Sequence, residues 1–263
     1  MKKCFTINSR RTTEDFIEFE KLLDEDIYQA CEIFYPYTSS DDNFRIYYNN
    51  VRNLKVHHLN SEVVMHLPFG RDNNLCDLSD YQRVVQRMKD AIEFTSHFGT
   101  KKLTLHLGYT TDDRPRKEYI AHIIPVLKVL CSFAKKYNMN VMIENMPTKE
   151  ELGYSPYEIR DIIDQTAMDN LKFILDTGHA HISEYEITDF IDVLHDKLYH
   201  MHFSDNHGES DEHKPMGEGN IDFKKIFDKL KEVGYDQLHC MEILFCSSDD
   251  LRRYAKDFDK FSK

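Results

Sequence analysis

Residues 102–146 read KLTLHLGYTTDDRPRKEYIAHIIPVLKVLCSFAKKYNMNVMIENM, and this stretch decides the fold. Two short apolar runs, at 102–108 and 140–146, flank a segment at 115–138 in which apolar residues recur with the period of a helix. Two strands that a helix of this length connects run parallel, and such crossovers are right-handed. The stretch therefore predicts a strand–helix–strand unit of a parallel sheet.

The same unit recurs along the rest of the chain. Helix-period stretches at 78–99 and 221–234 follow apolar runs, whereas residues 14–58 offer several helix boundaries. Eight units of about 30 residues predict an α/β fold, a single (β/α)8 TIM barrel that occupies residues 1–263 as one domain. A doubly wound open sheet is the structural alternative. The remaining candidate strands are KCFTI (3–7), ACEIFY (30–35), EVVMHLPF (62–69), LKFILDT (171–177), LYHMHFS (198–204) and LHCMEIL (238–244).

The charge and the cysteine content restrict the class of protein. Asp and Glu outnumber Lys and Arg by 46 to 34, and the formal net charge of -12 disfavours nucleic acid, whose phosphates must be neutralised. The six cysteines form no CxxC pair, which favours a reducing compartment. No apolar run has the length of a signal-peptide core or a membrane span, so we expect a cytoplasmic protein without a membrane partner. An oligomer is compatible with the sequence.

Ionisable residues stand at the C-terminal ends of six apolar runs. A buried charge is costly unless it is paired or binds a metal, and in a barrel these strand ends meet on the face where active sites form. Any one of these residues alone has an ordinary structural explanation, such as a hydrogen-bonded histidine or a helix cap. Together they predict a metal-binding active site at the C-terminal ends of the strands. They are His66, His106, Glu144, Asp176, His179, His202 and Glu242.

The stretch HMHFSDNHGESDEHKPMGEG (200–219) adds two further candidates. Asp211 and His213 precede a GEG turn that we expect to place them over the barrel mouth, as ligands of an additional metal. His200 shares one side of its strand with His202, which favours a supporting position. Carboxylates and imidazoles without thiolates suit a divalent metal, with zinc or manganese ahead of iron, cobalt and magnesium.

Seven motifs between residues 62 and 245 resemble the xylose-isomerase-like TIM-barrel superfamily, which includes sugar and sugar-phosphate isomerases and epimerases and the endonuclease IV class of abasic-site nucleases. In the ketose 3-epimerases, one divalent metal is held at positions that match Glu144, Asp176, His202 and Glu242. The resemblance implies that Glu144 and Glu242 also move the proton through an enediolate, one on each face of the substrate. The motifs are HLPFG (66–70), LHLGY (105–109), IENMP (143–147), LDTGHAH (175–181), HMHFSDN (200–206), DEHKPMGEGNIDF (211–223) and CMEI (240–243).

The endonuclease IV branch implies a different metal content. There, three zinc ions are held by nine ligands, and this sequence has a counterpart for each of them. Asp211 and His213 are the informative additions, because the simple epimerases usually carry an arginine where His213 falls. We therefore expect between one and three ions per chain. The nine positions are His66, His106, Glu144, Asp176, His179, His202, Asp211, His213 and Glu242.

The loops after the strands bear on the choice between these branches. Those at 178–186 and 205–214 are acidic or mixed, which disfavours duplex DNA. Arg114, Arg116 and Lys117 form a basic cluster, which we expect to be the solvated start of a helix rather than a sugar-phosphate site. The sequence thus predicts a divalent-metal-dependent isomerase or epimerase of a small sugar or sugar phosphate. The alternatives are a multinuclear-zinc phosphoester hydrolase, such as an abasic-site nuclease, and a non-catalytic sugar-binding barrel.

Overall fold

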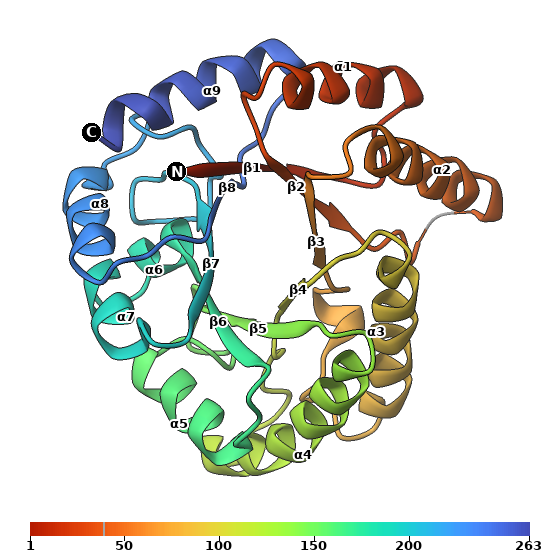
Figure 1. The fold of residues 1–263 in the computed structure, drawn as a ribbon. Coiled ribbons are helices and arrows are strands. Elements are labelled where there is room, and N and C mark those ends of the chain that lie inside the picture. The colour runs from red at the N-terminus through yellow and green to blue at the C-terminus, as the bar shows by residue number, and fades with distance from the viewer. Residues whose placement is uncertain (39) are drawn as a thin grey trace.

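The computed structural model describes residues 1–38 and 40–263. Eight parallel strands pair in chain order and close into a barrel, with the helices on its outside (Figure 1). Strands β1 (Lys2–Ile7) and β8 (Leu238–Met241) close the ring, with Cys4 opposite Cys240. This confirms the predicted TIM barrel. The doubly wound alternative is wrong, because an open sheet would not pair its first and last strands in this way.

All eight predicted strands are present, and most of them end before the apolar runs that predicted them. Strand β4 (Lys102–Leu105) stops one residue before His106, and β8 stops one residue before Glu242. The polar side chains are therefore at, or just beyond, the C-terminal ends of the strands. The other strands are β2 (Ala30–Phe34), β3 (Glu62–His66), β5 (Asn140–Glu144), β6 (Leu171–Asp176) and β7 (Leu198–Phe203).

Several helices begin where side chains satisfy the free N–H groups of the first turn. Thr12 and Asp15 form a capping box on α1 (Thr13–Asp24), and Ser247 and Asp250 form one on α9 (Ser248–Phe261). Several helix boundaries were possible in the segment at 14–58, and the structure places most of α1, all of β2 and all of α2 there. The other helices are α2 (Asp41–His57), η1 (Arg71–Asn73), α3 (Tyr81–Ser96), α4 (Arg116–Lys135), α5 (Pro156–Thr166), α6 (Thr177–Ile182), α7 (Ile187–Leu194) and α8 (Phe223–Glu232).

Apolar side chains fill the space between strands and helices and part of the barrel interior. The apolar residues inside the barrel form a separate group, and most of them are small. An eight-stranded barrel has an interior just wide enough for side chains to fill. Buried polar residues of β2 and β7 adjoin this group. The barrel therefore supports a polar site on an apolar base. The interior group consists of Cys4, Ala30, Val64, Met142, Ile174, Leu238 and Cys240.

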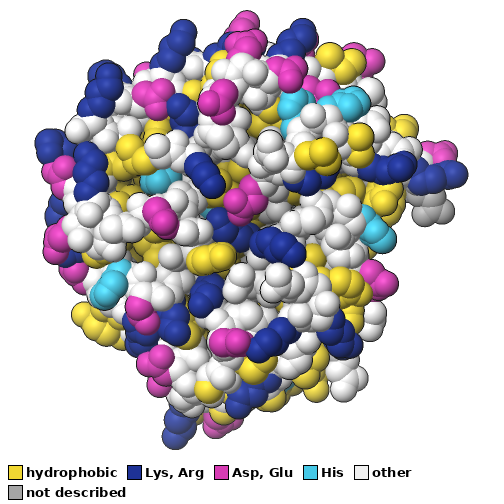
Figure 2. All heavy atoms as spheres, in the orientation of Figure 1, with side chains coloured by type: hydrophobic (Ala, Val, Ile, Leu, Met, Phe, Trp, Pro, Cys, Tyr) yellow, Lys and Arg dark blue, Asp and Glu magenta, His cyan; other side chains and the backbone are white. Residues whose placement is uncertain are grey.

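The surface carries both signs of charge. On the face shown in Figure 2, Lys and Arg side chains are interspersed with Asp and Glu side chains. Some of the surface charges pair, as Lys229 does with Asp192 at 2.6 Å, but exposed pairs of this kind contribute little to stability. Within the described residues, no helix combines the length and the apolar character that a membrane span requires.

Candidate metal-binding active site

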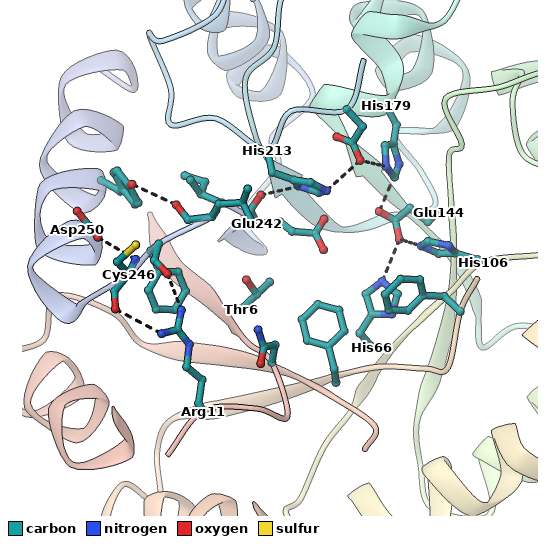
Figure 3. A pocket seen from close by; sticks show the side chains of 18 residues that line it. Thr6, Arg11, His66, His106, Glu144, His179, His213, Glu242, Cys246 and Asp250 are labelled. Carbon is teal, nitrogen blue, oxygen red and sulfur yellow. Dashed lines mark hydrogen bonds and ion pairs between the residues drawn. The ribbon is translucent and has the colours of Figure 1, made fainter. Parts of the chain in front are cut away.

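Glu144, at the end of β5, lies at the centre of the candidate site. It is fully buried, where an unpaired carboxylate would be costly. Its Oε2 lies 2.9 Å from His106 Nε2 and 3.6 Å from His66 Nε2, and its Oε1 lies 3.1 Å from His202 Nδ1. Figure 3 shows His66, His106 and His179 directed toward this carboxylate. Histidines from several neighbouring strand ends thus converge on one acidic group.

A second group of donor atoms adjoins the first. One atom each from Glu144, Asp176, His202 and Glu242 lies within 4.8 Å of the others. Glu242 Oε2 is 2.9 Å from His202 Nδ1, the same nitrogen that contacts Glu144. The buried Oδ2 of Asp176 has no hydrogen-bond partner in the part of the chain that the structure describes. Three carboxylates and one imidazole nitrogen therefore surround one small volume.

Asn145 ties the ends of β5 and β6 together. Its side-chain amide donates to the backbone carbonyl of Asp176 at 3.0 Å, and its Oδ1 accepts from the N–H of Asp176 at 2.7 Å. Asp176 in turn caps α6, since its Oδ1 accepts from the N–H of His179 at 2.7 Å. The free Oδ2 of Asp176 is thereby held toward the neighbouring carboxylates.

The loop between β7 and α8 is anchored by one buried carboxylate. Asp205 accepts hydrogen bonds from the N–H groups of Asn206, Gly217, Gly219 and Ile221, at 2.9, 2.8, 2.9 and 3.1 Å. A Cβ atom at Gly219 would lie 2.3 Å from the carbonyl oxygen of Asn206, so only glycine fits there. These contacts fold the loop back onto the barrel.

The tip of this loop brings two predicted ligands to the cavity. Asp211 Oδ2 lies 2.9 Å from His213 Nε2 and 3.3 Å from His179 Nε2. His213 has a positive φ of 45°, which is uncommon for a residue with a side chain. Its Nδ1 donates to the backbone carbonyl of Glu242 at 3.0 Å, so the loop is joined directly to the end of β8.

Three of the histidines share one hydrogen-bond pattern. In His66, His179 and His213, Nδ1 lies 2.9 to 3.0 Å from a backbone carbonyl oxygen. A carbonyl oxygen only accepts, so Nδ1 carries the proton and Nε2 presents its lone pair to the cavity when the ring is neutral. Histidines that bind metals are commonly oriented in this way.

The buried carboxylates and imidazoles of the site shift one another's pKa values. Burial raises the pKa of Asp176 to about 7, although His179 opposes the rise. Burial also raises the pKa of Glu242, but His202 outweighs burial and leaves that pKa at about 2. Burial alone would lower the pKa of His213, yet the surrounding carboxylates raise it to about 10. Protons on imidazoles therefore compensate the buried carboxylates in the metal-free protein.

The donor set fits a divalent metal. A cation would satisfy the unpartnered oxygen of Asp176 and replace the protons that compensate the carboxylates. Oxygen and imidazole ligands without thiolates suit zinc or manganese. Two donor groups share Glu144, namely His66, His106 and Glu144, and Glu144, Asp176, His202 and Glu242.

The cavity above these groups has a volume of about 690 Å³. Its walls are formed by Phe34, Phe69, Phe245 and Tyr254, and Figure 3 shows Arg11 on the side opposite His106. The Arg11 guanidinium lies over the Phe245 ring at 4.1 Å and donates to the Phe245 carbonyl at 2.6 Å. The cavity is therefore apolar along its walls and acidic at its floor.

The structure brings all nine predicted ligand positions together. Seven line the cavity, while Asp176 and His202 are fully buried beside them. The basic cluster is elsewhere: Arg114 pairs with Asp112, and the Arg116 side chain pairs with an acidic residue of α5. Arg116 begins α4, as the sequence predicted, but both arginines are paired with protein carboxylates rather than left to solvent.

Sequence reasoning missed Glu32. Its Oε2 lies 2.8 Å from Nε2 of both His200 and His202, and its Oε1 accepts from Thr104 Oγ1 at 2.7 Å. Burial raises the pKa of Glu32, but the two histidines outweigh burial and hold the pKa well below its usual range. The signal was present, because Glu32 interrupts the apolar run ACEIFY, but it lies in the middle of the strand rather than at its end.

Comparisons with known proteins agree with this geometry. Residues 28–260 match the model of a family described as xylose isomerase-like TIM barrel. A crystal structure of a D-tagatose 3-epimerase-like protein superposes with a TM-score of 0.80 at 26% identity, covering 99% of each chain. An uncharacterized protein of Methanocaldococcus jannaschii is 31% identical over 191 residues, which are 69% of this chain and 64% of that protein.

Other relatives have named activities, and two of them represent the two branches. Fructoselysine 3-epimerase of Shigella flexneri is 23% identical over 152 residues, 57% of this chain and 54% of that enzyme. A probable endonuclease 4 of Mycoplasmopsis pulmonis is 25% identical over 190 residues, 67% of this chain and 66% of that protein. The chain thus matches less than two thirds of the length of each of these three relatives. With its closed eight-stranded barrel and the match over residues 28–260, the chain belongs to the family of xylose isomerase-like TIM barrels.

Proposed function

We propose that this protein is a divalent-metal-dependent isomerase or epimerase of a small ketose. The observation that supports it best is the pair Glu144 and Glu242, whose oxygens lie 3.1 and 2.9 Å from the same nitrogen, His202 Nδ1. Both carboxylates line the cavity. Inversion next to a carbonyl needs one group to remove a proton and another to deliver a proton to the opposite face. Two glutamates from β5 and from the end of β8 are suited to this division of roles.

The metal in this proposal is held by Glu144, Asp176, His202 and Glu242. When bound, the ion supplies Lewis-acid stabilisation of the negative charge that develops on the substrate oxygens. The histidines at positions 66, 106 and 179 bind further ions or substrate hydroxyls. The aromatic side chains of the cavity walls offer apolar contacts to the substrate beside these carboxylates.

A neutral ketose fits the cavity better than a sugar phosphate. Among the described residues that line it, Arg11 is the sole Lys or Arg, whereas Glu144, Asp211, Glu242 and Asp250 are acidic. Arg11 is already bonded to the backbone and stacked on an aromatic ring. Away from the metal, a phosphate dianion would therefore meet carboxylates without a free Lys or Arg side chain to bind it. The C–H faces of a neutral sugar match the aromatic walls.

Proton abstraction is tested by solvent deuterium. We expect the metal-loaded protein to incorporate deuterium from D2O into at least one member of a panel of unphosphorylated ketoses, at the carbon next to the carbonyl. NMR of the recovered sugar measures the exchange, and chelated protein provides the baseline. Full metal loading without exchange into any ketose of the panel would contradict the proposed function.

A phosphoester hydrolase is the second candidate. The observation that favours it is the position of Asp211, which joins His179 and His213 and would let the site hold more than one ion beside the group His66, His106 and Glu144. Incision of an abasic duplex, assayed at low and moderate salt, tests this reading. Incision by protein that carries about three zinc ions per chain would favour it over the epimerase.

Metal binding is expected to tighten as the pH rises from 6 to 8. The pKa of Asp176 is raised to about 7 and that of His202 is raised well above its ordinary value, so both hold protons that a metal must displace. Each displaced proton makes the affinity change about tenfold per pH unit. The pKa values of both groups are higher in the folded protein than in the unfolded chain, so folding is favoured while the groups hold their protons. The metal-free protein should therefore lose stability as the pH rises over the same range. Calorimetric titration with zinc in buffers of different ionisation enthalpy measures the proton release.

A further inference from the structure

We propose that Glu32 is a positioning residue that fixes the ring of His202 so that its Nδ1 faces the metal site. The inference rests on the metal site of the proposed function and extends it to a residue that touches neither metal nor substrate. Glu32 is the third residue of β2 and is fully buried. Its hydrogen-bond partners belong to β4 and β7, which are not neighbours of β2 in the sheet, so its side chain reaches across the barrel interior.

Both oxygens of the Glu32 carboxylate accept hydrogen bonds. Its Oε2 lies 2.8 Å from Nε2 of His200 and 2.8 Å from Nε2 of His202, while Thr104 Oγ1 donates to Oε1 at 2.7 Å. An ionised carboxylate only accepts hydrogen bonds, so the Nε2 atom of each ring carries a proton. The other nitrogen of His202 is therefore free to act as a ligand.

That second nitrogen points at the proposed ligand group. His202 Nδ1 lies 3.1 Å from Glu144 Oε1, 2.9 Å from Glu242 Oε2 and 3.9 Å from Asp176 Oδ2. A ring turned by 180° about its bond to Cβ would present a carbon atom to these oxygens and another carbon to Glu32. The contact with Glu32 opposes that rotation and makes Nδ1 more basic, as carboxylate partners of metal-binding histidines do.

The buried group formed by Glu32, His200, His202 and Cys240 is better explained as one that orients His202 than as a second metal site. Donor atoms of Glu32, His200, His202 and Cys240 lie within 4.8 Å of one another, which by itself would suit a metal. However, the two histidine–carboxylate contacts already satisfy these donors. The fourth member of the group, the Cys240 thiol, is buried among the apolar side chains of the barrel interior.

The test replaces the charge of Glu32 and keeps its shape. In Glu32→Gln the side-chain carbonyl still accepts from His202, and the amide still contacts Thr104, but the negative charge is lost. Zinc affinity of metal-free protein is measured by competition with a chromophoric chelator, and chemical denaturation of the metal-free forms records stability. We expect zinc to bind about 10- to 100-fold more weakly to Glu32→Gln than to the wild type.

Thr104→Val is the matched control. It removes the hydrogen bond to the other oxygen of Glu32 and leaves both histidine contacts in place. A smaller loss of zinc affinity in this control than in Glu32→Gln supports the inference, and equal losses in the two variants would overturn it. Wild-type affinity in Glu32→Gln would overturn it while leaving the proposed function intact. Absence of zinc binding by the wild type would instead overturn the metal site itself.

A measurement on the wild type covers the case in which Glu32→Gln does not fold. Nitrogen-15 NMR of histidine-labelled, zinc-loaded protein identifies the protonated nitrogen of each ring, and loss of one signal set in His202→Asn assigns His202. We expect His202 to carry its proton on Nε2 and to bind the metal through Nδ1. The reverse arrangement, with the proton on Nδ1, would overturn the role of Glu32.

Discussion

Replacing Glu144 by Gln is expected to slow epimerisation about 10²- to 10⁴-fold, the range that general acid–base residues contribute. The amide of Gln cannot accept the substrate proton, and it removes the carboxylate on which His66, His106 and His202 converge. Because Glu144 belongs to both donor groups, the variant should also bind less metal. Turnover and bound metal are both measured, so that rates are compared per loaded site.

Glu242→Gln provides a directional comparison. We expect Glu144 and Glu242 to face opposite sides of the substrate. Each single variant should then still exchange deuterium into the one epimer whose proton faces the remaining glutamate. Inversion, which needs both glutamates, should be lost in both variants. Glu209→Gln is the control, because Glu209 is an exposed carboxylate of the loop at the mouth, and its turnover should match the wild type. Wild-type turnover in a fully loaded Glu144→Gln would show that Glu144 does not move the proton.

The fold was predictable because its signals are local. Each apolar run and each helix-period stretch is read within a window of a few turns, and eight such units favoured a closed barrel, although an open sheet was excluded only by the pairing of β1 with β8. Seven of the nine candidate ligands were proposed for a related reason, since a polar residue at the end of an apolar strand stands out against its neighbours. Asp211 and His213 lie in a loop and were proposed from the GEG turn that follows them and from the resemblance to endonuclease IV. His106 and Glu242 lie one residue beyond β4 and β8, where the structure ends strands that the apolar pattern continues.

The residues that orient the candidate ligands, such as Glu32 and Asp205, were harder to predict because their partners are remote in the sequence. Glu32 contacts His200 and His202 across 168 and 170 positions of the chain. Asp205 binds the N–H groups of residues 12 to 16 positions later, which a sequence pattern does not distinguish from an ordinary acidic loop. The sequence gives the residue types that a metal needs, whereas the three-dimensional fold determines which neighbouring groups orient them.

Asp205, which anchors the loop that contains Asp211 and His213, is expected to contribute strongly to stability. Asp205→Asn keeps one accepting oxygen but replaces Oδ2 with an amide nitrogen, which cannot accept from the N–H groups of Gly217 and Gly219. Buried donors left without acceptors cost about 1–3 kcal/mol each, so we expect the free energy of unfolding to fall by about 3 kcal/mol. Chemical denaturation of the metal-free variant measures this loss.

The same change should also release the ligands that the loop carries. With its anchor weakened, the loop no longer holds Asp211 and His213 against His179, so zinc bound beyond the first ion should be lost before the ion at Glu144. Asp222→Asn is the matched control, because Asp222 caps α8 by accepting from the N–H of Lys225, and Asn caps a helix about as well as Asp, so this change should leave stability nearly unaltered. Equal stability and equal zinc content in the two variants would show that the Asp205 contacts do not hold the loop, and that Asp211 and His213 reach the cavity by the strength of their own contacts with β8 and α6.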